Sequence, residues 1–250
     1  MTDATTGTTT DRATGRAADR RPFTEELWAA GEGVYAAVLD HPFLRGLTDG
    51  SLPREAFRHF VRQDAHYLRD YARALAVCAA KAPTEDDVRA LADDAVGAIA
   101  AEQEMHAAFM AELGAGTGDG DAAGTGDGDA AADEVLPTTR AYTSYLLATV
   151  YGGSFAEGLA AVLPCYWIYA RVGERLLAAS SPDPLYARWI AAYGDEAFQA
   201  VVRRVLALAD RVGEELSPAE RRRAVRHFAT TARYEWMFWD AAWRGERWPV

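Results

Sequence analysis

The sequence predicts an all-α, single-domain bundle of about seven or eight helices. Apolar residues recur near the 3.6-residue period of an α-helix along most of the chain. Residues that favour helix starts, chiefly Ser, Thr and Pro, precede these apolar runs. Period-two strand patterns joined by hairpin turns are absent from the sequence. Half of the 250 residues are hydrophobic, so the chain can bury a substantial core.

Three helices are predicted before the middle of the chain. The apolar period of the first ends at His41, because the following Pro42 disfavours a further helical turn. Pro53 fits the first turn of a long second helix, where a missing amide hydrogen costs no bond. Thr84 precedes three acidic residues, which is typical of an N-cap with acids in the first turn. The predicted ranges are 24–40, 53–81 and 84–113.

Five helices are predicted in the second half. Pro137 opens the first of them, and Pro164 is expected to interrupt the next, since proline removes one intrahelical hydrogen bond. The last helix has the strongest start, because Ser217 and Glu220 form a capping-box pattern with a proline at the first helical position. The predicted ranges are 137–151, 154–179, 184–193, 195–216 and a final helix from 217.

Two segments fall outside this pattern. Residues 1–22 are rich in Thr and Arg and lack an apolar period, which predicts a disordered tail. The string GTGDGDAA occurs twice in succession over 116–131, inside a Gly/Asp-rich low-complexity loop predicted at 114–134. Its aspartates invite a calcium interpretation, but two copies cannot bury the core of a stacked β-helix, so a flexible linker is favoured. The predicted folded domain spans 23–250 with this loop inside it.

Charge and composition narrow the possible functions. The formal net charge is −11 and no basic stripe interleaves with aromatic residues, so we expect no nucleic-acid partner. No apolar run approaches the roughly 20 residues that span a bilayer, so no membrane is expected either. Two cysteines, Cys78 and Cys165, provide no disulfide framework and favour a reducing, cytoplasmic location. Schiff-base chemistry would depend on Lys81, the only lysine.

A helical bundle rich in acidic residues raises the question of a di-iron site, which needs Glu-x-x-His pairs. None of the five histidines has a Glu three positions before it, so we expect no dinuclear metal. Glu102 and His106 stand four positions apart and could share a metal ion. Such a pair more often belongs to a solvated helix face.

The first candidate for chemistry is Cys165, which follows Pro164 inside an aromatic run. A proline in mid-helix costs about 3 kcal/mol, and local strain of this kind concentrates at functional sites. A cysteine there is a candidate nucleophile. The alternative is a buried structural cysteine beside a packing kink, because free Cys is among the most buried residue types. Tyr169, four residues on, shares its helix face.

Two acidic residues stand among apolar neighbours. Asp64 lies three residues before Tyr67 on one helix face, and Glu235 lies in one of the most aromatic stretches of the chain. A desolvated carboxyl there would have a raised pKa, as a general acid near neutrality requires. Alternatively, Arg233 or Arg244 could make Glu235 an ordinary ion pair. Spacing alone assigns two further tyrosines, Tyr142 and Tyr193, to the core.

Several sequence blocks, taken together and in order, resemble the TenA family, thiaminase II. They are QDAHYL (63–68), YTS (142–144), LPCYWIY (163–169) and VGE (172–174), with HPF (41–43), YARWIAAY (186–193), YE (234–235) and FW (238–239), and the similarity covers 23 to about 244. The resemblance implies a haem-oxygenase-like helical fold without haem, a homotetramer, and no metal or organic cofactor. The implied activity is hydrolysis of 4-amino-5-aminomethyl-2-methylpyrimidine, of thiamin, or of both, in thiamin salvage.

The resemblance makes Cys165 the nucleophile, Glu235 the proton donor and Tyr67 the group that activates the thiol. His66 departs from members that place an aromatic residue there, which affects the packing behind Tyr67. Two alternatives stay open: a pyrimidine-binding or regulatory protein that keeps the pocket without turnover, and an oxygenase of the same helical architecture. The residues that would hold the substrate are Asp64, Tyr142, Tyr169 and Tyr193.

Deleting residues 1–20 and 116–131 should leave the melting temperature and turnover nearly unchanged, because neither segment has the apolar residues needed to join a core. Thermal denaturation of the double deletion beside the full chain measures this. A collapse of the melting temperature, or a calcium-dependent shift of it in the full chain, would contradict the prediction.

Overall fold

The structure, a computed structural model, describes residues 21–101, 107–115 and 134–250. These ranges contain ten helices and no strands, which confirms the prediction of an all-α, single-domain bundle. The helices are α1 (Phe23–Leu39), α2 (Pro42–Asp49), α3 (Arg54–Lys81), α4 (Glu85–Ala101), α5 (Ala107–Ala115), α7 (Pro137–Gly152), α8 (Phe155–Leu177), α9 (Pro184–Gly194), α10 (Glu196–Glu215) and α11 (Pro218–Arg244).

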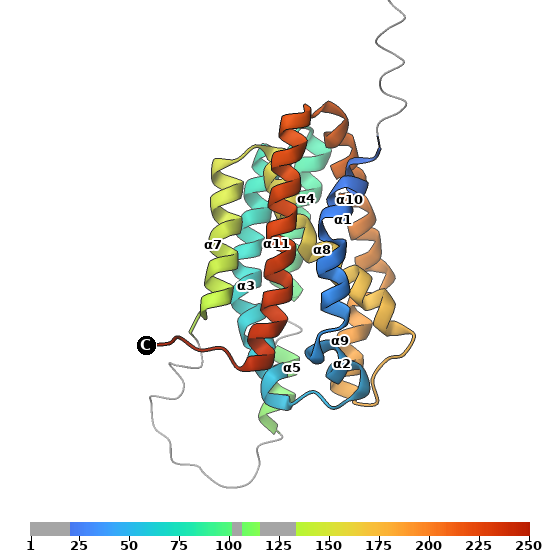
Figure 1. Ribbon diagram of the computed structural model, residues 1–250, viewed down its shortest axis with the longest axis vertical. Coiled ribbons are helices and arrows are strands. Elements are labelled where there is room, and N and C mark those ends of the chain that lie inside the picture. Colours follow the sequence, from blue (N-terminus) through green and yellow to red (C-terminus); the bar gives the residue numbers. More distant parts are fainter. Residues whose placement is uncertain (1–20, 102–106, 116–133) are drawn as a thin grey trace, which may run out of the picture.

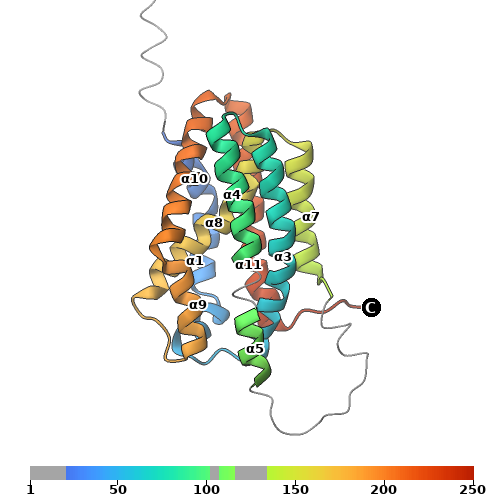
Figure 2. The ribbon, with the colours of Figure 1, turned by 180° about the vertical axis from the view of Figure 1, so that it is seen from behind.

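Helix α8 occupies the centre of the bundle. Figure 1 shows α11 in front, between α1 on one side and α3 and α7 on the other, and Figure 2 shows α10, α4 and α3 across the back. Most residues of α8 are buried. A helix enclosed in this way can present side chains to a cavity between the helices. The helices that pack most closely on α8 are α1, α3, α7, α9, α10 and α11.

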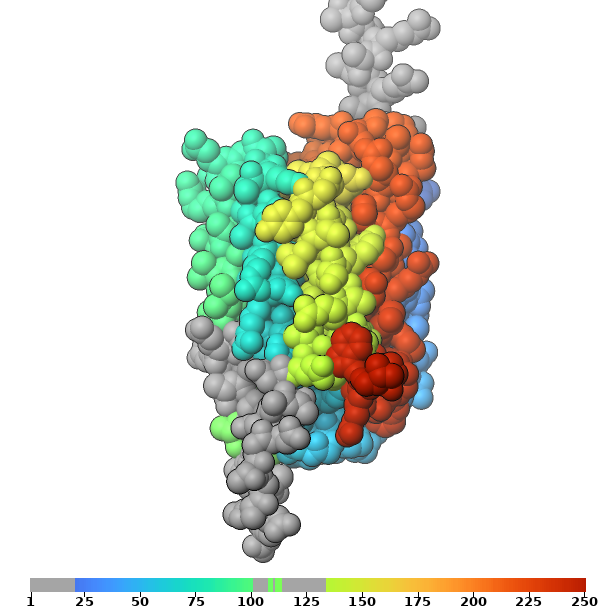
Figure 3. All heavy atoms as spheres, turned by 90° about the vertical axis from the view of Figure 1, so that its left-hand side faces the viewer, coloured from blue at the N-terminus to red at the C-terminus, as the bar shows by residue number. Residues whose placement is uncertain are grey.

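The first turn of α7 is held from two sides. In Figure 3 the C-terminal segment lies across the lower end of α7. From this segment, the Glu246 carboxylate accepts hydrogen bonds from the Thr138 amide (2.9 Å) and hydroxyl (2.8 Å). From α3, the Gln63 side-chain oxygen accepts a bond from the Leu136 amide at 3.0 Å. These bonds fix the start of the helix that carries Tyr142 one turn further on.

The helix starts agree with the local sequence signals. The Ser217 hydroxyl accepts from the Glu220 amide (3.3 Å), and the Glu220 carboxylate accepts from the Ser217 amide (2.8 Å), so the predicted capping box is confirmed. The Thr84 hydroxyl likewise accepts from the Asp87 amide at 3.2 Å. These side chains satisfy first-turn amides that have no partner within the helix.

Helix α2 is absent from the sequence prediction. His41 and Pro42 do end α1, but Pro42 also opens α2, with His41 as the N-cap that accepts from the Phe43 amide at 3.1 Å. The helix ends at Gly50, whose φ of +81° lies in the left-handed region that favours glycine. Eight residues provide little more than two turns of apolar period, which is too short for periodicity to identify.

The predicted helix over 84–113 corresponds to two described helices, α4 and α5, and the residues between them lie outside the described ranges. Several expectations fall on undescribed residues. They are the Glu102–His106 pair, the tail over 1–20 and the repeat over 116–131.

Pro164 does not interrupt α8, contrary to the sequence prediction. The helix continues from Phe155 to Leu177 with Pro164 inside it. Proline removes only one intrahelical bond, and its cost of about 3 kcal/mol is small against the burial of a helix enclosed by its neighbours. Among those neighbours, α3 contacts the same stretch of α8, because the Tyr71 hydroxyl donates to the Val162 carbonyl at 3.0 Å.

Lys81, the only lysine, has a structural role. Its ammonium group donates to the carbonyls of Val150 (2.6 Å), Tyr151 (3.1 Å) and Gly153 (2.8 Å) at the C-terminal end of α7. A cation there satisfies carbonyls without helical partners and complements the helix dipole. Within the described ranges no helix is both long enough and apolar enough to cross a membrane.

Candidate active site

A cavity of about 900 Å³ lies beside α8, within the size range of roughly 300 to 1,000 Å³ that small-molecule sites occupy. Its walls come from α3, α4, α5, α8, α9 and α10. Four of the seven residues singled out in the sequence line it directly: Asp64, Cys165, Tyr169 and Tyr193.

Cys165 borders the cavity and retains part of its accessible surface, although it lies deep in the protein. Burial raises the pKa of its thiol well above the usual value, and the negative charge of Glu235 acts in the same direction. The hydroxyl groups of Tyr67 and Tyr71 oppose this rise in pKa. The thiol is therefore neutral in the empty site at neutral pH, and it ionises only when a proton acceptor is supplied.

Cys78 provides a contrast within the same chain. It is buried in α3 against α8, where a Cβ added at Gly158 would lie 3.2 Å from the Cys78 sulfur. Burial raises the pKa of this thiol to about 12. Cys78 does not line the cavity, so it is a structural cysteine and a matched control for Cys165.

Glu235 does not line the cavity and is 1 % exposed. Its carboxyl accepts a hydrogen bond from the Tyr142 hydroxyl at 2.6 Å. Burial raises the pKa of Glu235 to about 8; the Tyr142 bond lowers it and the charge of Asp64 raises it further. The carboxyl is therefore protonated at pH 7. Arg244 does not form the ion pair with Glu235 that the sequence allowed, because it pairs with Asp240 at 2.7 Å. Arg233, the other candidate partner, is exposed.

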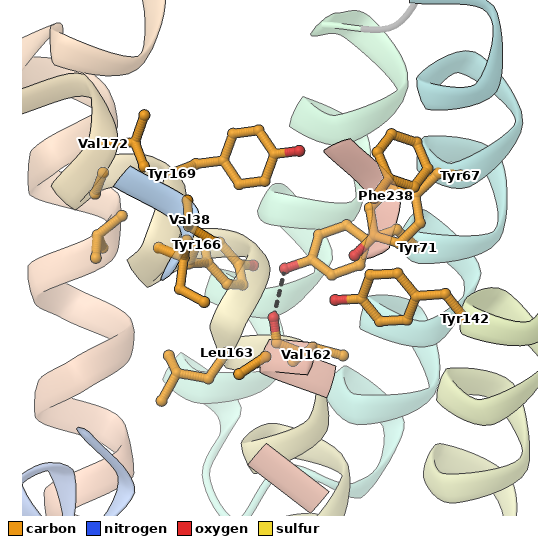
Figure 4. Close-up of a cluster of buried hydrophobic side chains, with 14 of the residues drawn as sticks. Val38, Tyr67, Tyr71, Tyr142, Val162, Leu163, Tyr166, Tyr169, Val172 and Phe238 are labelled. Carbon is orange, nitrogen blue, oxygen red and sulfur yellow. Dashed lines mark hydrogen bonds between the residues drawn. The ribbon is translucent and has the colours of Figure 1, made fainter. Parts of the chain in front are cut away.

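Tyrosine rings form two facing groups around these residues. Tyr67 and Tyr142 pack with ring centroids 4.8 Å apart, and Tyr169 and Tyr193 do the same at 4.8 Å. In Figure 4 the rings of Tyr67, Tyr71 and Tyr142 gather on one side, and Tyr169 extends toward them from α8. Burial raises the pKa of all five hydroxyl groups well above the usual value, so they remain hydrogen-bond donors.

The Tyr67 hydroxyl is buried and forms no hydrogen bond of regular geometry with the described residues. It still lowers the pKa of the Cys165 thiol. A buried hydroxyl without a regular bond costs free energy unless a partner reaches it. This group can therefore turn toward a thiolate when one forms.

The structure thus brings all seven predicted site residues together from five helices, including Tyr142 and Tyr193, which spacing alone assigns to the core. Two residues that hold Tyr193 were missed. Gly173 lets α9 approach α8, because a Cβ there would lie 2.3 Å from the Tyr193 carbonyl carbon. Gln199 donates to the carbonyls of Ala170 (3.1 Å) and Tyr193 (3.1 Å). The glycine of the VGE block was the available signal, whereas nothing in the sequence distinguishes Gln199.

The far wall of the cavity carries a second polar cluster that the sequence did not indicate. The Tyr166 hydroxyl donates to Asp94 Oδ2 at 2.9 Å, and Arg204 pairs with Asp94 Oδ1. All three residues line the cavity. Asp94 stands in an acidic helix, where the sequence pattern is typical of a solvated face. Within the described ranges no group of three His, Cys, Asp or Glu side chains is arranged to hold a metal ion.

Fold and site define a helical-bundle protein with a cavity of small-molecule size, lined by a thiol and several tyrosines and close to a buried carboxyl of raised pKa. The chain belongs to the TENA/THI-4/PQQC family, whose model matches residues 28–245. It is 34 % identical over 226 residues to an aminopyrimidine aminohydrolase from Bacillus subtilis (strain 168), covering 90 % of this chain and 92 % of that one.

Solved structures agree with this membership. A TenA homologue from P. horikoshii OT3 matches with a TM-score of 0.74 and 29 % identity, covering 89 % of this chain and 99 % of that one. A domain with a haem-oxygenase-like fold from Shewanella denitrificans matches with a TM-score of 0.64 and 13 % identity, covering 89 % and 92 %. The sequence resemblance and the expected haem-oxygenase-like fold are therefore both confirmed.

Burial of Glu235 predicts a pH-dependent cost to stability. Between the unfolded pKa of about 4.3 and the folded pKa of about 8, the folded chain keeps a proton that the unfolded chain has lost. The contribution of Glu235 to the free energy of unfolding is therefore most favourable below the unfolded pKa. It falls by about 1.4 kcal/mol per pH unit as the pH rises toward 8. Glu235→Gln, which stays neutral, should be the more stable protein at pH 8 by a few kcal/mol, and this advantage should vanish near pH 4 to 5.

Urea denaturation of both proteins from pH 5 to 8.5 measures this difference. A constant difference in unfolding free energy across that range would contradict a raised pKa at Glu235.

Proposed function

We propose that the protein is a hydrolase of thiamin-related aminopyrimidines, acting on 4-amino-5-aminomethyl-2-methylpyrimidine, on thiamin, or on both. The similarity to aminopyrimidine aminohydrolases over 90 % of the chain supports the substrate class. One observation supports catalysis above all: a cavity thiol, Cys165, lies in electrostatic contact with a carboxyl of pKa about 8, Glu235. No metal or organic cofactor takes part in the proposed reaction.

The site suits a flat, electron-poor ring with a hydrogen-bonding edge. Tyr169 and Tyr193 offer aromatic faces along one side of the cavity. Asp64 offers a carboxylate to the amidine edge of the ring, where an amino group and a ring nitrogen lie side by side. Tyr142 contributes indirectly, because its hydroxyl donates a hydrogen bond to Glu235. The substrate is held with its reactive carbon toward Cys165.

The first chemical step is addition of the thiol to the pyrimidine ring. The Cys165 sulfur forms a bond to a ring carbon while Glu235 gives its proton to a ring nitrogen, and the thiol proton restores Glu235. Tyr67 stabilises the developing thiolate from the side. Because the thiol and the carboxyl are both neutral at rest, this exchange needs no external base.

The second step breaks the bond to the leaving group. Electrons of the dearomatised ring expel the leaving group from the adjacent methylene carbon, either ammonia from the protonated aminomethyl group or the neutral thiazole of thiamin. Water adds to that carbon and gives up a proton, which the released ammonia takes up or which passes to solvent. The sulfur then leaves and recovers the proton of the ring nitrogen as the ring regains its aromaticity. The products are the hydroxymethyl pyrimidine and ammonium or thiazole.

A pyrimidine-binding or regulatory protein without turnover is the competing proposal. Such a protein needs a complementary pocket but has no use for a nucleophile beside a protonated carboxyl, which costs stability at neutral pH. This cost favours the enzyme. A homotetramer, which the resemblance implies, stays a prediction.

Cys165→Ser should reduce turnover of both substrates by at least about 10³-fold, because serine raises the nucleophile's pKa far out of reach. Substrate binding should persist, since the variant keeps the size of the side chain. Steady-state kinetics and calorimetric binding measure the two effects. Cys78→Ser is the matched control and should leave turnover nearly unchanged. Retention of more than about a tenth of the turnover by Cys165→Ser would show that the thiol is a packing residue.

Glu235→Gln should lower kcat by roughly 10² to 10⁴-fold, because the amide keeps the shape and loses the proton. In the unsubstituted enzyme the rate should fall as the pH rises through about 8, where the carboxyl loses that proton. This alkaline fall should be missing from the residual rate of Glu235→Gln. An identical pH profile in both proteins would assign proton donation to another group.

A further inference from the structure

The turn of α8 that carries Cys165 lacks one of its own hydrogen bonds. Pro164 has no amide hydrogen, so the Ala160 carbonyl loses its usual helical donor. The helix continues through this turn without a break. Contacts from other helices can therefore help to fix this turn and the thiol that follows it.

Two tyrosine hydroxyl groups make such contacts, one on each side of Cys165 along the chain. Tyr71 of α3 donates to the Val162 carbonyl, three residues before Cys165, at 3.0 Å (Figure 4). Tyr166, the residue after Cys165, donates to Asp94 of α4 at 2.9 Å. The rings of Tyr71 and Tyr166 also pack against each other, with centroids 5.8 Å apart.

Asp94 is itself held in place. Its side chain is 7 % exposed, and its second oxygen pairs with Arg204 of α10. Burial raises the pKa of Asp94, while Arg204 and the Tyr166 hydroxyl lower it. The carboxylate therefore joins α4, α8 and α10 at the wall of the cavity, next to the residue that follows the thiol.

We propose that Asp94 is a positioning residue for Cys165, which acts through the Tyr166 hydroxyl to hold the proline-containing turn of α8. The proposal rests on the proposed function, in which Cys165 adds to the substrate ring. A bond from the next residue in the chain limits rotation of this turn and keeps the sulfur beside Tyr67 and the cavity. Misplacement of a reacting group by 1 Å can cost on the order of 10²-fold in rate.

The same hydrogen bond could instead serve only to stabilise the fold, and the chain offers a matched control for that possibility. Tyr186 of α9 is buried and donates to the Leu52 carbonyl at 2.7 Å, and it does not line the cavity. Tyr186→Phe and Tyr166→Phe each remove one tertiary bond from a tyrosine and keep the ring. Both should lower the melting temperature by a similar amount, about 2 to 4 °C.

The kinetic test compares these variants in a Cys78→Ser background, so that Cys165 is the only thiol. Tyr166→Phe and Asp94→Ala should each lower kcat about tenfold with KM changed by less than about twofold. Asp94→Asn, which keeps an acceptor oxygen, should restore most of the loss. The double variant Tyr166→Phe/Asp94→Ala should be no slower than the slower single variant, because both substitutions remove the same Tyr166–Asp94 hydrogen bond. Tyr186→Phe should leave kcat unchanged.

A second readout does not need turnover. The rate of Cys165 alkylation by iodoacetamide, followed against pH, reports the thiol's ionisation. Its midpoint should rise by roughly half a pH unit or more in Tyr166→Phe, as the sulfur moves away from the tyrosine hydroxyls, and should stay fixed in Tyr186→Phe.

These results separate the two proposals. If the Cys78→Ser protein hydrolyses neither substrate while the alkylation midpoint shifts as expected, the proposed function fails and the positioning role stands. If Tyr166→Phe loses melting temperature like Tyr186→Phe but keeps its kcat and alkylation midpoint, the bond only stabilises the fold and the positioning role is overturned.

Discussion

The neutral state of the buried Glu235 carboxyl is the constraint on which the site depends. Desolvation disfavours its charge, and the raised pKa of about 8 keeps the proton in place at pH 7. The same burial raises the pKa of Cys165, and the charge of Glu235 disfavours ionisation of the thiol. The pair therefore holds one negative charge far more readily than two. In the proposed mechanism this links proton donation to thiolate formation, since the carboxyl would give up a proton and regain one from the thiol.

Most of the fold could be predicted from the sequence because helix starts and apolar periods are local properties. The Ser217 capping box and the N-terminal prolines identified helix boundaries to within a few residues. Periodicity missed the short helix α2. Local rules overstated the effect of Pro164, because the burial of α8 on several sides outweighs one lost hydrogen bond. Local rules describe an isolated helix, whereas α8 is surrounded by other helices.

The candidate site was harder to predict, since its parts are brought together only by the fold. Glu235 and Asp64 stood out as charges among apolar neighbours, and Cys165 as a thiol after a proline. Tyr142 and Tyr193 did not, because a tyrosine that lines an internal cavity has the same spacing as one in the core. Asp94 could not be identified because it lies in an acidic helix among other acidic residues. Only its contacts with Tyr166 and Arg204, 72 and 110 residues away, distinguish it.

The position of the cavity thiol after a proline in a central helix has a physical consequence for the whole bundle. A regular helix would position Cys165 through its own backbone bonds, so its geometry would be set locally. Here the Pro164 bond, one residue before the thiol, is missing, and the turn is also held by Tyr71 from α3 and by Asp94 from α4, which pairs with Arg204 of α10. The location of the thiol thus depends on three helices that are distant in sequence. Changes in their packing can therefore adjust the position of the thiol without a change at Cys165 itself.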